Sequence, residues 1–201
     1  MINIGLTGGL ASGKSAVGRQ LEKLGCFVIR MDDLGHQVLE PGGEAYGPVV
    51  TEFGPDIVNA DGSINRRLLG GRVFADPTQL KKLGSLVHPP VRARAKVLRD
   101  AFAASSPDAI IVTEAAIMIE TGSHKEYDRL ILVVCRPEQQ IERAMERDGL
   151  TQDEVESRIR RQMPLEDKRK YANYVIDTSG TKENTEQQTR SVYEVLRKLT
   201  H

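Results

Sequence analysis

One short motif constrains the fold of this chain more than any other feature. Residues 8–15, GGLASGKS, match the pattern G-x-x-x-x-G-K-[ST] and lie between a short apolar run and a segment with helical spacing. Glycines allow the backbone to wrap until several N–H groups point at one phosphate, and the N-terminus of a helix adds the positive end of its dipole. The motif therefore predicts a strand, a phosphate-binding loop and a helix, in that order, and a bound nucleoside triphosphate.

Two side chains of this phosphate loop (residues 8–15) are expected to take part in chemistry. Lys14 is predicted to reach the β- and γ-phosphates, and the hydroxyl of Ser15 is placed to hold Mg²⁺. The loop predicts a triphosphate site without selecting a reaction, because many different functions share one fold. The loop residues predicted to bind the nucleotide are Gly9, Ala11, Ser12, Gly13, Lys14, Ser15 and Ala16.

Five short apolar runs alternate with helical patterns along the chain. The runs occupy residues 2–6, 26–29, 109–112, 130–135 and 174–176. Helices are expected at 16–24, where Gly25 ends the pattern, from Thr151 onward, where Glu154 completes a capping box, and at 185–199. Because strands that are buried on both faces read as nearly continuous apolar runs, the sequence predicts a doubly wound α/β fold with a mostly parallel five-stranded sheet.

Two segments do not fit a plain alternation of strands and helices. Residues 34–105 are too many for a simple crossover, and helical patches at 66–74, 79–87 and 91–102 are punctuated there by PGG, FGPD, ADG and HPP. Residues 148–170 are highly charged and contain SRIRRQMPLEDKRK. We expect a single domain over residues 1–201 that carries a mostly helical insertion at about 34–105 and a lid at about 148–170.

Composition narrows the class of partner. The chain has 28 Lys and Arg against 28 Asp and Glu, and this balance argues against binding to nucleic acid or to an anionic membrane. Cys26 and Cys135 border apolar runs and fit buried side chains better than a metal site or a disulfide framework. No apolar run approaches the ~18 residues of a membrane span, and no secretory signal is evident. We expect a cytoplasmic protein with small-molecule substrates, and the sequence leaves its oligomeric state open.

Two adjacent aspartates follow the second apolar run, in the stretch FVIRMDDLGH. The carboxyl ends of parallel strands converge at one edge of a sheet, so Asp32 and Asp33 are expected on the same side as the phosphate loop. Phosphoryl transfer needs a group that accepts the proton of the attacking hydroxyl, and a carboxylate can do this. The alternative for each aspartate is the N-cap of the following helix, where Asp is a favoured residue.

Other polar side chains have both a functional and an ordinary interpretation. Arg143 and Arg147 lie four residues apart on one helix face, where they either close over phosphates or pair with neighbouring glutamates. Glu114 follows the third run, where a carboxylate either orients a Mg²⁺-bound water or serves at the surface or as a cap. His36 and His88 either touch a substrate or are structural.

Taken together, these segments resemble one family, dephospho-coenzyme A kinase, the last enzyme of coenzyme A synthesis. The resemblance implies a P-loop kinase fold in which residues 34–105 bind the substrate and residues 148–170 form a lid. It also implies that ATP, with Mg²⁺, phosphorylates the ribose 3′-hydroxyl of dephospho-coenzyme A. The segments that carry it, from residue 4 to about residue 180, are GLTGGLASGKS, LGCFVIRMDDLGHQVLEPGG, FGPDIVNADGSINRRLLGGRVFADP, LGSLVHPPV and YDRLILVVCRPEQQIERAMERDGLTQDEVESRIRRQMPLEDKRKYANYVIDTSG.

The resemblance also assigns roles to individual residues. Asp32 falls on the family's catalytic aspartate, the second acid of a D-x-D pattern, which leaves Asp33 as the helix cap. Arg143 matches the arginine that contacts the phosphates of ATP, with Arg147 as its neighbour, and HP at residues 88–89 matches an H-P of the substrate region. The predicted catalytic residues are Asp32, Lys14 and Arg143, and the predicted substrate-binding residues are Asp32, His88 and Pro89.

Four positions depart from the family pattern. Arg30 replaces the first acid of D-x-D, Ala16 replaces a threonine after the loop serine, Ala116 replaces a proline, and Thr178 replaces an asparagine near the adenine. Two alternative functions are a nucleoside or nucleoside-monophosphate kinase on the same scaffold and a nucleotide-dependent switch that transfers no phosphate. Because Lys14 and the other predicted catalytic residues are all present, we expect an active enzyme.

Overall fold

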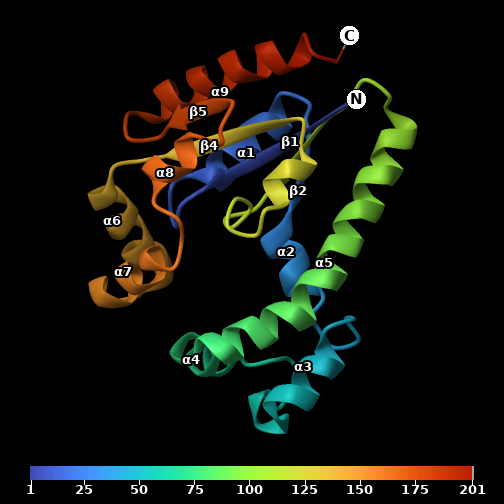
Figure 1. The fold of residues 1–201 in the computed structure, drawn as a ribbon, viewed down its shortest axis with the longest axis vertical. Helices are drawn as coiled ribbons and strands as arrows, with labels where there is room; N and C mark the ends of the chain where they lie inside the picture. Colours follow the sequence, from blue (N-terminus) through green and yellow to red (C-terminus); the bar gives the residue numbers. More distant parts are fainter. Residues whose placement is uncertain (201) are drawn as a thin grey trace. The chain divides into compact units, whose positions relative to one another are not determined.

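The phosphate loop follows the central strand of a five-stranded sheet. The computed structural model describes residues 1–200 and orders the strands β2-β3-β1-β4-β5 (Figure 1). The pairings of β1 with β3, β1 with β4 and β4 with β5 are all parallel, which confirms the predicted doubly wound α/β fold. The strands are β1 (Ile2–Gly8), β2 (Phe27–Arg30), β3 (Ile110–Glu114), β4 (Arg129–Val134) and β5 (Tyr174–Asp177).

The chain divides into two compact units. The first contains residues 1–29 together with residues from 101 onward, and the second contains residues 30–100. The sheet, apart from Arg30 at the end of β2, belongs to the first unit, and so does the phosphate loop. The helices of this unit are α1 (Lys14–Lys23), the 3-10 helix η2 (Ser123–Glu126), α6 (Pro137–Asp148), α7 (Gln152–Arg160), α8 (Leu165–Arg169) and α9 (Lys182–Arg197).

The core of the first unit fixes the strand that leads into the phosphate loop. Ile4 and Leu6 of β1 and Ile131 of β4 are fully buried, because helices cover both faces of the sheet. Helix α1 packs against α9, and each of the two also contacts a strand (Figure 1). Since the burial of one large aliphatic side chain contributes ~1.5–3 kcal/mol, the end of β1 is held firmly where the loop begins.

Helix ends in the first unit follow the signals in the sequence. Gly25 has a φ of 100°, and the N–H of Cys26 donates to Leu21 O at 3.0 Å, so α1 ends where glycine predicts. Thr151 Oγ1 accepts from the N–H of Glu154, and the Glu154 carboxylate accepts from the N–H of Thr151 at 2.9 Å. The predicted capping box at the start of α7 is therefore confirmed.

The second unit is helical. Exposed ion pairs join its segments: Arg94 pairs with Glu44 at 2.7 Å, and Arg72 pairs with Asp56 and donates to Phe53 O at 2.8 Å. Its elements are α2 (Met31–Gln37), α3 (Tyr46–Phe53), the 3-10 helix η1 (Pro55–Ile57), α4 (Arg66–Ala75) and the larger part of α5 (Pro77–Ser105). Its buried apolar side chains include Leu34, Val38, Val49, Phe53, Ile57, Leu69 and Val73.

Helix α5 is longer than the sequence predicts. The sequence places a break at HPP, residues 88–90, whereas the structure has one helix of 29 residues with Pro89 and Pro90 inside it (Figure 1). A proline inside a helix removes a backbone hydrogen bond and crowds the preceding turn, at a cost of ~3 kcal/mol or more. Val91, directly after the prolines, and Ala95, one turn further along, are both buried, and this packing offsets the local preference for a break.

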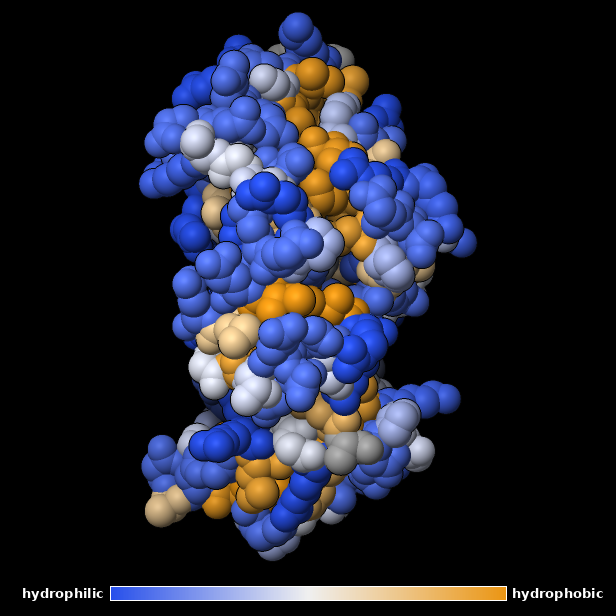
Figure 2. Space-filling model, turned by 90° about the vertical axis from the view of Figure 1, so that its left-hand side faces the viewer, coloured by the Kyte–Doolittle hydropathy of each residue, from blue (hydrophilic) through white to orange (hydrophobic). Residues whose placement is uncertain are grey.

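The cysteines are buried, and the face drawn in Figure 2 is mainly polar. Neither Cys26 nor Cys135 forms a disulfide, and burial raises the pKa of the Cys26 thiol to about 12. On the face drawn in Figure 2, polar and charged side chains predominate, and apolar atoms show in patches between them. Among residues 1–200, no helix is both long enough and apolar enough to cross a bilayer.

Candidate phosphate-binding site

A pocket of about 190 Å³ opens on the phosphate loop. Four of the nine residues that line it carry a positive charge and none carries a negative charge, so the pocket attracts a polyanion. Eight of them were predicted to bind the nucleotide; Arg19 is an addition, and the predicted Gly9 lies outside the lining. The lining residues are Ala11, Ser12, Gly13, Lys14, Ser15, Ala16, Arg19, Arg143 and Arg147.

The loop keeps its shape through backbone conformations that few residue types adopt. Gly13, the N-cap of α1, has a φ of 91°, in the left-handed region that favours glycine. A Cβ on Gly8 would lie 2.5 Å from Val133 O, so the close approach of the loop to β4 also requires glycine. Ala11 has a φ of 52° and is the only residue with a side chain in residues 1–200 to have a positive φ. Backbone strain of this kind costs ~1–3 kcal/mol and is typical of ligand-binding sites.

Lys14 and Ser15 are held at the first turn of α1. Lys14 Nζ donates to Gly9 O at 2.7 Å, so the ammonium group folds back over the loop. Ser15 Oγ donates to Glu114 Oε1 at 2.8 Å. Glu114, the last residue of β3, is only 7% exposed, so the interpretation of Glu114 as a surface residue was wrong. A hydroxyl and a carboxylate in contact beside a phosphate loop are oxygen ligands of the kind that Mg²⁺ prefers.

Arg143 is held by a residue that follows β5. Its Nη1 donates to Thr178 Oγ1 at 3.0 Å, and its Nη2 donates to Thr178 O at 2.8 Å. Thr178 is buried, and its hydroxyl donates to Ser12 O at 2.9 Å. One threonine therefore joins the arginine of α6 to the backbone of the phosphate loop. The guanidinium group has five N–H donors, so these two contacts leave donors for phosphate oxygens.

Arg147 and Arg19 complete the cationic lining. Arg147 Nε and Nη2 donate to Asp148 Oδ1 and Oδ2 at 2.7 Å and 2.9 Å, and this pairing holds the pKa of the Asp148 carboxyl below its usual range. Arg19 is exposed on α1, four residues after Ser15. The sequence gives one signal for Arg19 that was missed: residues four apart on a helix share a face, so a side chain one turn after the loop serine faces the same pocket.

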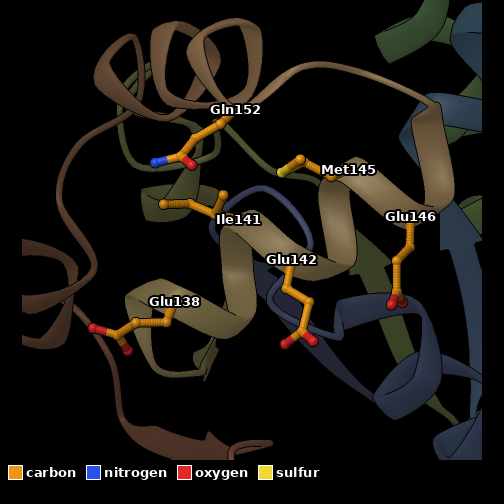
Figure 3. A pocket seen from close by; sticks show the side chains of 6 residues that line it. All are labelled: Glu138, Ile141, Glu142, Met145, Glu146 and Gln152. Atoms are coloured by element: carbon orange, nitrogen blue, oxygen red, sulfur yellow. The ribbon is translucent and has the colours of Figure 1, made fainter.

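A larger pocket of about 430 Å³ lies between α6 and α7 (Figure 3). In Figure 3, Glu142 and Glu146 extend from the same side of α6, as their spacing of four residues requires. Because the only charged groups in its lining are carboxylates, this pocket repels phosphate, and the smaller pocket is the candidate nucleotide site. The lining residues of the larger pocket are Glu138, Ile141, Glu142, Met145, Glu146 and Gln152.

The remaining predicted site residues belong to the second unit. Helix α2 begins at Met31 with Arg30 as its N-cap, so Asp32 and Asp33 both lie in its first turn and are exposed. The prediction that Asp33 caps the helix was therefore wrong, and its carboxylate instead lies beside the positive end of the helix dipole. His88 lies within α5, where burial and the positive charge of Arg92 lower its pKa from the ordinary value of 6.5. Pro89 is the next residue of that helix.

Comparison with known proteins finds relatives along the whole chain. A family model described as dephospho-CoA kinase matches residues 2–184. A dephospho-CoA kinase of Aquifex aeolicus is 40% identical over 196 residues, which cover 98% of each chain. A solved structure from Thermus thermophilus, 33% identical, superposes with a TM-score of 0.78 over 96% of this chain and 97% of the other. The dephospho-CoA kinase of Campylobacter jejuni, 23% identical, has a TM-score of 0.70 over 99% and 98% of the two chains and supports the fold alone.

Proposed function

This chain belongs to the dephospho-CoA kinase family, and from that membership we propose how its own residues transfer a phosphoryl group. It is an ATP-dependent phosphotransferase that phosphorylates the ribose 3′-hydroxyl of dephospho-CoA, with CoA and ADP as products. The observation that carries the proposal is the cationic pocket where the phosphate loop meets Arg143 and Arg147. The family match favours this reaction over a nucleoside kinase and over a switch that transfers no phosphate.

We assign the donor half of the reaction to Lys14 and Arg143. In the loose transition state of phosphoryl transfer, negative charge spreads over the oxygens of the transferred group, so fixed cations lower its energy. Lys14 Nζ donates a hydrogen bond to Gly9 O at 2.7 Å. When ATP binds, phosphate oxygens replace this carbonyl as the acceptor. Arg143 is fixed by Thr178 and so loses little freedom in binding a phosphate. The remaining proposed ATP contacts are Gly9, Ala11, Ser12, Gly13, Ser15, Ala16 and Arg147.

Ser15 and Glu114 are the residues that would hold Mg²⁺. This ion keeps several of its waters and takes one or two protein oxygens besides the phosphates of the nucleotide. The Ser15 hydroxyl, hydrogen-bonded to the buried Glu114 carboxylate, fits such a set of ligands. No cluster of three or more His, Cys, Asp or Glu side chains in residues 1–200 would form an all-protein site. When bound, the ion neutralises charge on the β- and γ-phosphates.

We assign the acceptor half to Asp32. As the 3′-oxygen attacks the γ-phosphorus and ADP leaves, the proton of the hydroxyl passes to the Asp32 carboxylate. Asp32 suits this role because it is exposed and follows the end of β2 by two residues. His88 and Pro89 are the proposed contacts to dephospho-CoA. Because its pKa is lowered, His88 is neutral near pH 7 and offers one hydrogen-bond donor and one acceptor instead of a charge.

Acceptor specificity tests the proposed function directly. The purified protein is incubated with ATP, Mg²⁺ and one acceptor at a time: dephospho-CoA, AMP, dCMP or adenosine. ADP and a phosphorylated product are expected with dephospho-CoA only. Turnover of a mononucleotide or nucleoside instead would indicate the rival kinase, and ATP binding without turnover of any acceptor would indicate the switch. The cytoplasmic location stays a prediction from the sequence.

A further inference from the structure

Lys168 is a buried charge for which the proposed chemistry has no use. Its side chain is fully buried on α8, which lies beside β4 (Figure 1). Lys168 Nζ donates to Ala116 O at 3.0 Å and pairs with Glu120 Oε1 at 2.9 Å. An ammonium group withdrawn from water is tolerated only where it is paired and hydrogen-bonded, so these two contacts restrict the position of α8 closely.

The carboxylate that binds Lys168 also holds the segment between α7 and α8. Glu120 Oε1 accepts a hydrogen bond from the N–H of Met163 at 2.9 Å. The side chain of Met163 packs against the buried apolar cluster that contains Met118 and Leu130. Residue 163 is therefore anchored through both its backbone and its side chain, and its chain neighbour at position 162 is restricted with it.

Gln162 connects this anchored segment to the phosphate loop. Gln162 Oε1 accepts a hydrogen bond from the N–H of Leu10 at 3.0 Å. Leu10 is the third residue of the loop and directly precedes Ala11, the residue with a φ of 52°. A Cβ on Gly9 would lie 3.4 Å from Leu165 Cδ2, so α8 also packs close to the loop. The contacts place Gln162 against the turn of the loop whose backbone is the most strained.

We propose that Gln162 is a positioning residue for ATP binding and that the Lys168–Glu120 ion pair fixes the position of Gln162. The inference rests on the proposed function, because it takes the phosphate loop as the ATP site. By accepting the N–H of Leu10, the Gln162 amide stabilises the loop shape that the neighbouring strained residue requires. Residues 148–170, the predicted lid, thus act on the ATP site through one hydrogen bond.

The variant Gln162→Leu tests the first step, because it keeps the size of the side chain and removes the acceptor. The Kd for ATP, measured by calorimetry, and the KM for ATP are expected to rise by roughly two- to tenfold, the effect of losing one neutral hydrogen bond. The KM for dephospho-CoA is expected not to change. Lys170→Met, which removes a nearby exposed cation, is the matched control. It is expected to leave both the Kd and the KM for ATP unchanged.

A double-mutant cycle tests the second step. The pair Lys168→Met with Glu120→Gln replaces both charges by neutral groups of similar size, so no unpaired charge stays buried. This paired variant is expected to raise the Kd for ATP as Gln162→Leu does, and to add nothing further when both changes are combined. Non-additive effects are expected only where residues act through one contact, whereas a purely structural role for the pair would lower thermal stability and give additive effects on affinity.

Two results would overturn the inference. One is an unchanged Kd for ATP in Gln162→Leu, and the other is additive effects on Kd in the cycle. If the paired variant fails to fold, the exchange rate of the Leu10 amide in Gln162→Leu decides instead, since faster exchange is expected only if that contact holds the loop. The calorimetric readout needs no turnover. If the wild-type protein binds ATP but fails to phosphorylate dephospho-CoA, the proposed function is wrong while the inference about Gln162 is still tested.

Discussion

The two units of the molecule hold their candidate site residues in different ways. In the first unit, Lys14, Ser15 and Arg143 each make a hydrogen bond to the protein, at distances of 2.7 to 3.0 Å. In the second unit, Asp32 is exposed in the first turn of α2. The groups proposed to bind the triphosphate are therefore fixed in advance, whereas the carboxylate proposed to accept the proton of the acceptor is exposed to water.

This difference separates what each set of residues can contribute. Fixed donors and cations stabilise developing charge without reorganisation, which is the larger part of catalysis in phosphoryl transfer. An exposed carboxylate is accessible to an incoming hydroxyl, and its environment changes only when substrate excludes water. Substitutions in the first unit should therefore act on the parameters for ATP, and those in the second unit on turnover of the acceptor.

The largest effect is expected from Lys14→Ala. The variant removes the one cation of the loop itself, and we expect kcat/KM for ATP to fall on the order of 10³-fold, at the upper end for loss of one charge-stabilising group. Steady-state kinetics with saturating dephospho-CoA measures it, and Lys23→Ala at the other end of α1 is the control. A loss smaller than tenfold, with the fold intact by circular dichroism, would contradict the assignment of Lys14.

Asp32→Asn should act on the opposite half of the reaction. The amide keeps the shape of the side chain but cannot accept the proton of the 3′-hydroxyl, so we expect kcat to fall by ~10²-fold or more while the Kd for ATP stays the same. Steady-state turnover assays measure kcat, and calorimetry measures the Kd for ATP. An unchanged kcat would show that another group accepts the proton. A raised Kd for ATP would contradict the expectation that residues of the second unit act only on turnover of the acceptor.

Thr178→Val is expected to have an intermediate effect within the first unit. Valine has nearly the same shape, so the variant removes only the hydroxyl that accepts from Arg143 and donates to Ser12 O. Two lost hydrogen bonds correspond to a fall of about tenfold in kcat/KM for ATP. Thr178→Ser keeps the hydroxyl and should retain most of the activity. Equal activity of the valine and serine variants would show that Arg143 needs no such support.

Local features of the first unit could be predicted from the sequence, and its long-range contacts could not. The phosphate loop, the apolar strands and the capping box at Thr151 each depend on residues close together in the chain, so spacing alone reveals them. Thr178 contacts Ser12 across 166 positions, and Gln162 contacts Leu10 across 152. Such pairs depend on how strands and helices pack, so the sequence marks Thr178 only as a departure from a family pattern.

In the second unit, the sequence misplaced even local boundaries. The N-cap of α2 is Arg30 instead of Asp33, because the helix begins directly where β2 ends. The prolines at 89 and 90 do not interrupt α5, because the helix that continues beyond them buries Val91. Cap and breaker signals are weak preferences; the direct connection to β2 outweighs the cap signal of Asp33, and packing of the helix outweighs the break signal of the prolines.

Asp33→Asn tests the corrected position of Asp33 and is also the matched control for Asp32. A carboxylate in the first turn of a helix stabilises it by about 0.3–1 kcal/mol through the dipole, so the free energy of unfolding should fall by no more than that. Urea denaturation at low salt measures the change, and high salt should reduce it. Kinase activity is expected to equal that of the wild type. A loss of activity like that of Asp32→Asn would mean that the two aspartates share one role.

The smallest effect concerns the pH dependence contributed by His88. Its pKa in the folded protein is lowered, mainly by burial and then by Arg92, so between that value and 6.5 the unfolded chain binds more protons than the folded one. The free energy of unfolding contributed by His88 is therefore complete above pH 6.5 and is lost as the pH falls through the folded pKa. His88→Gln should make denaturation midpoints less sensitive to pH below 6.5, with little change at pH 7. Unchanged pH sensitivity would place His88 in water, and the proposal that a neutral His88 contacts dephospho-CoA would then lose its physical basis.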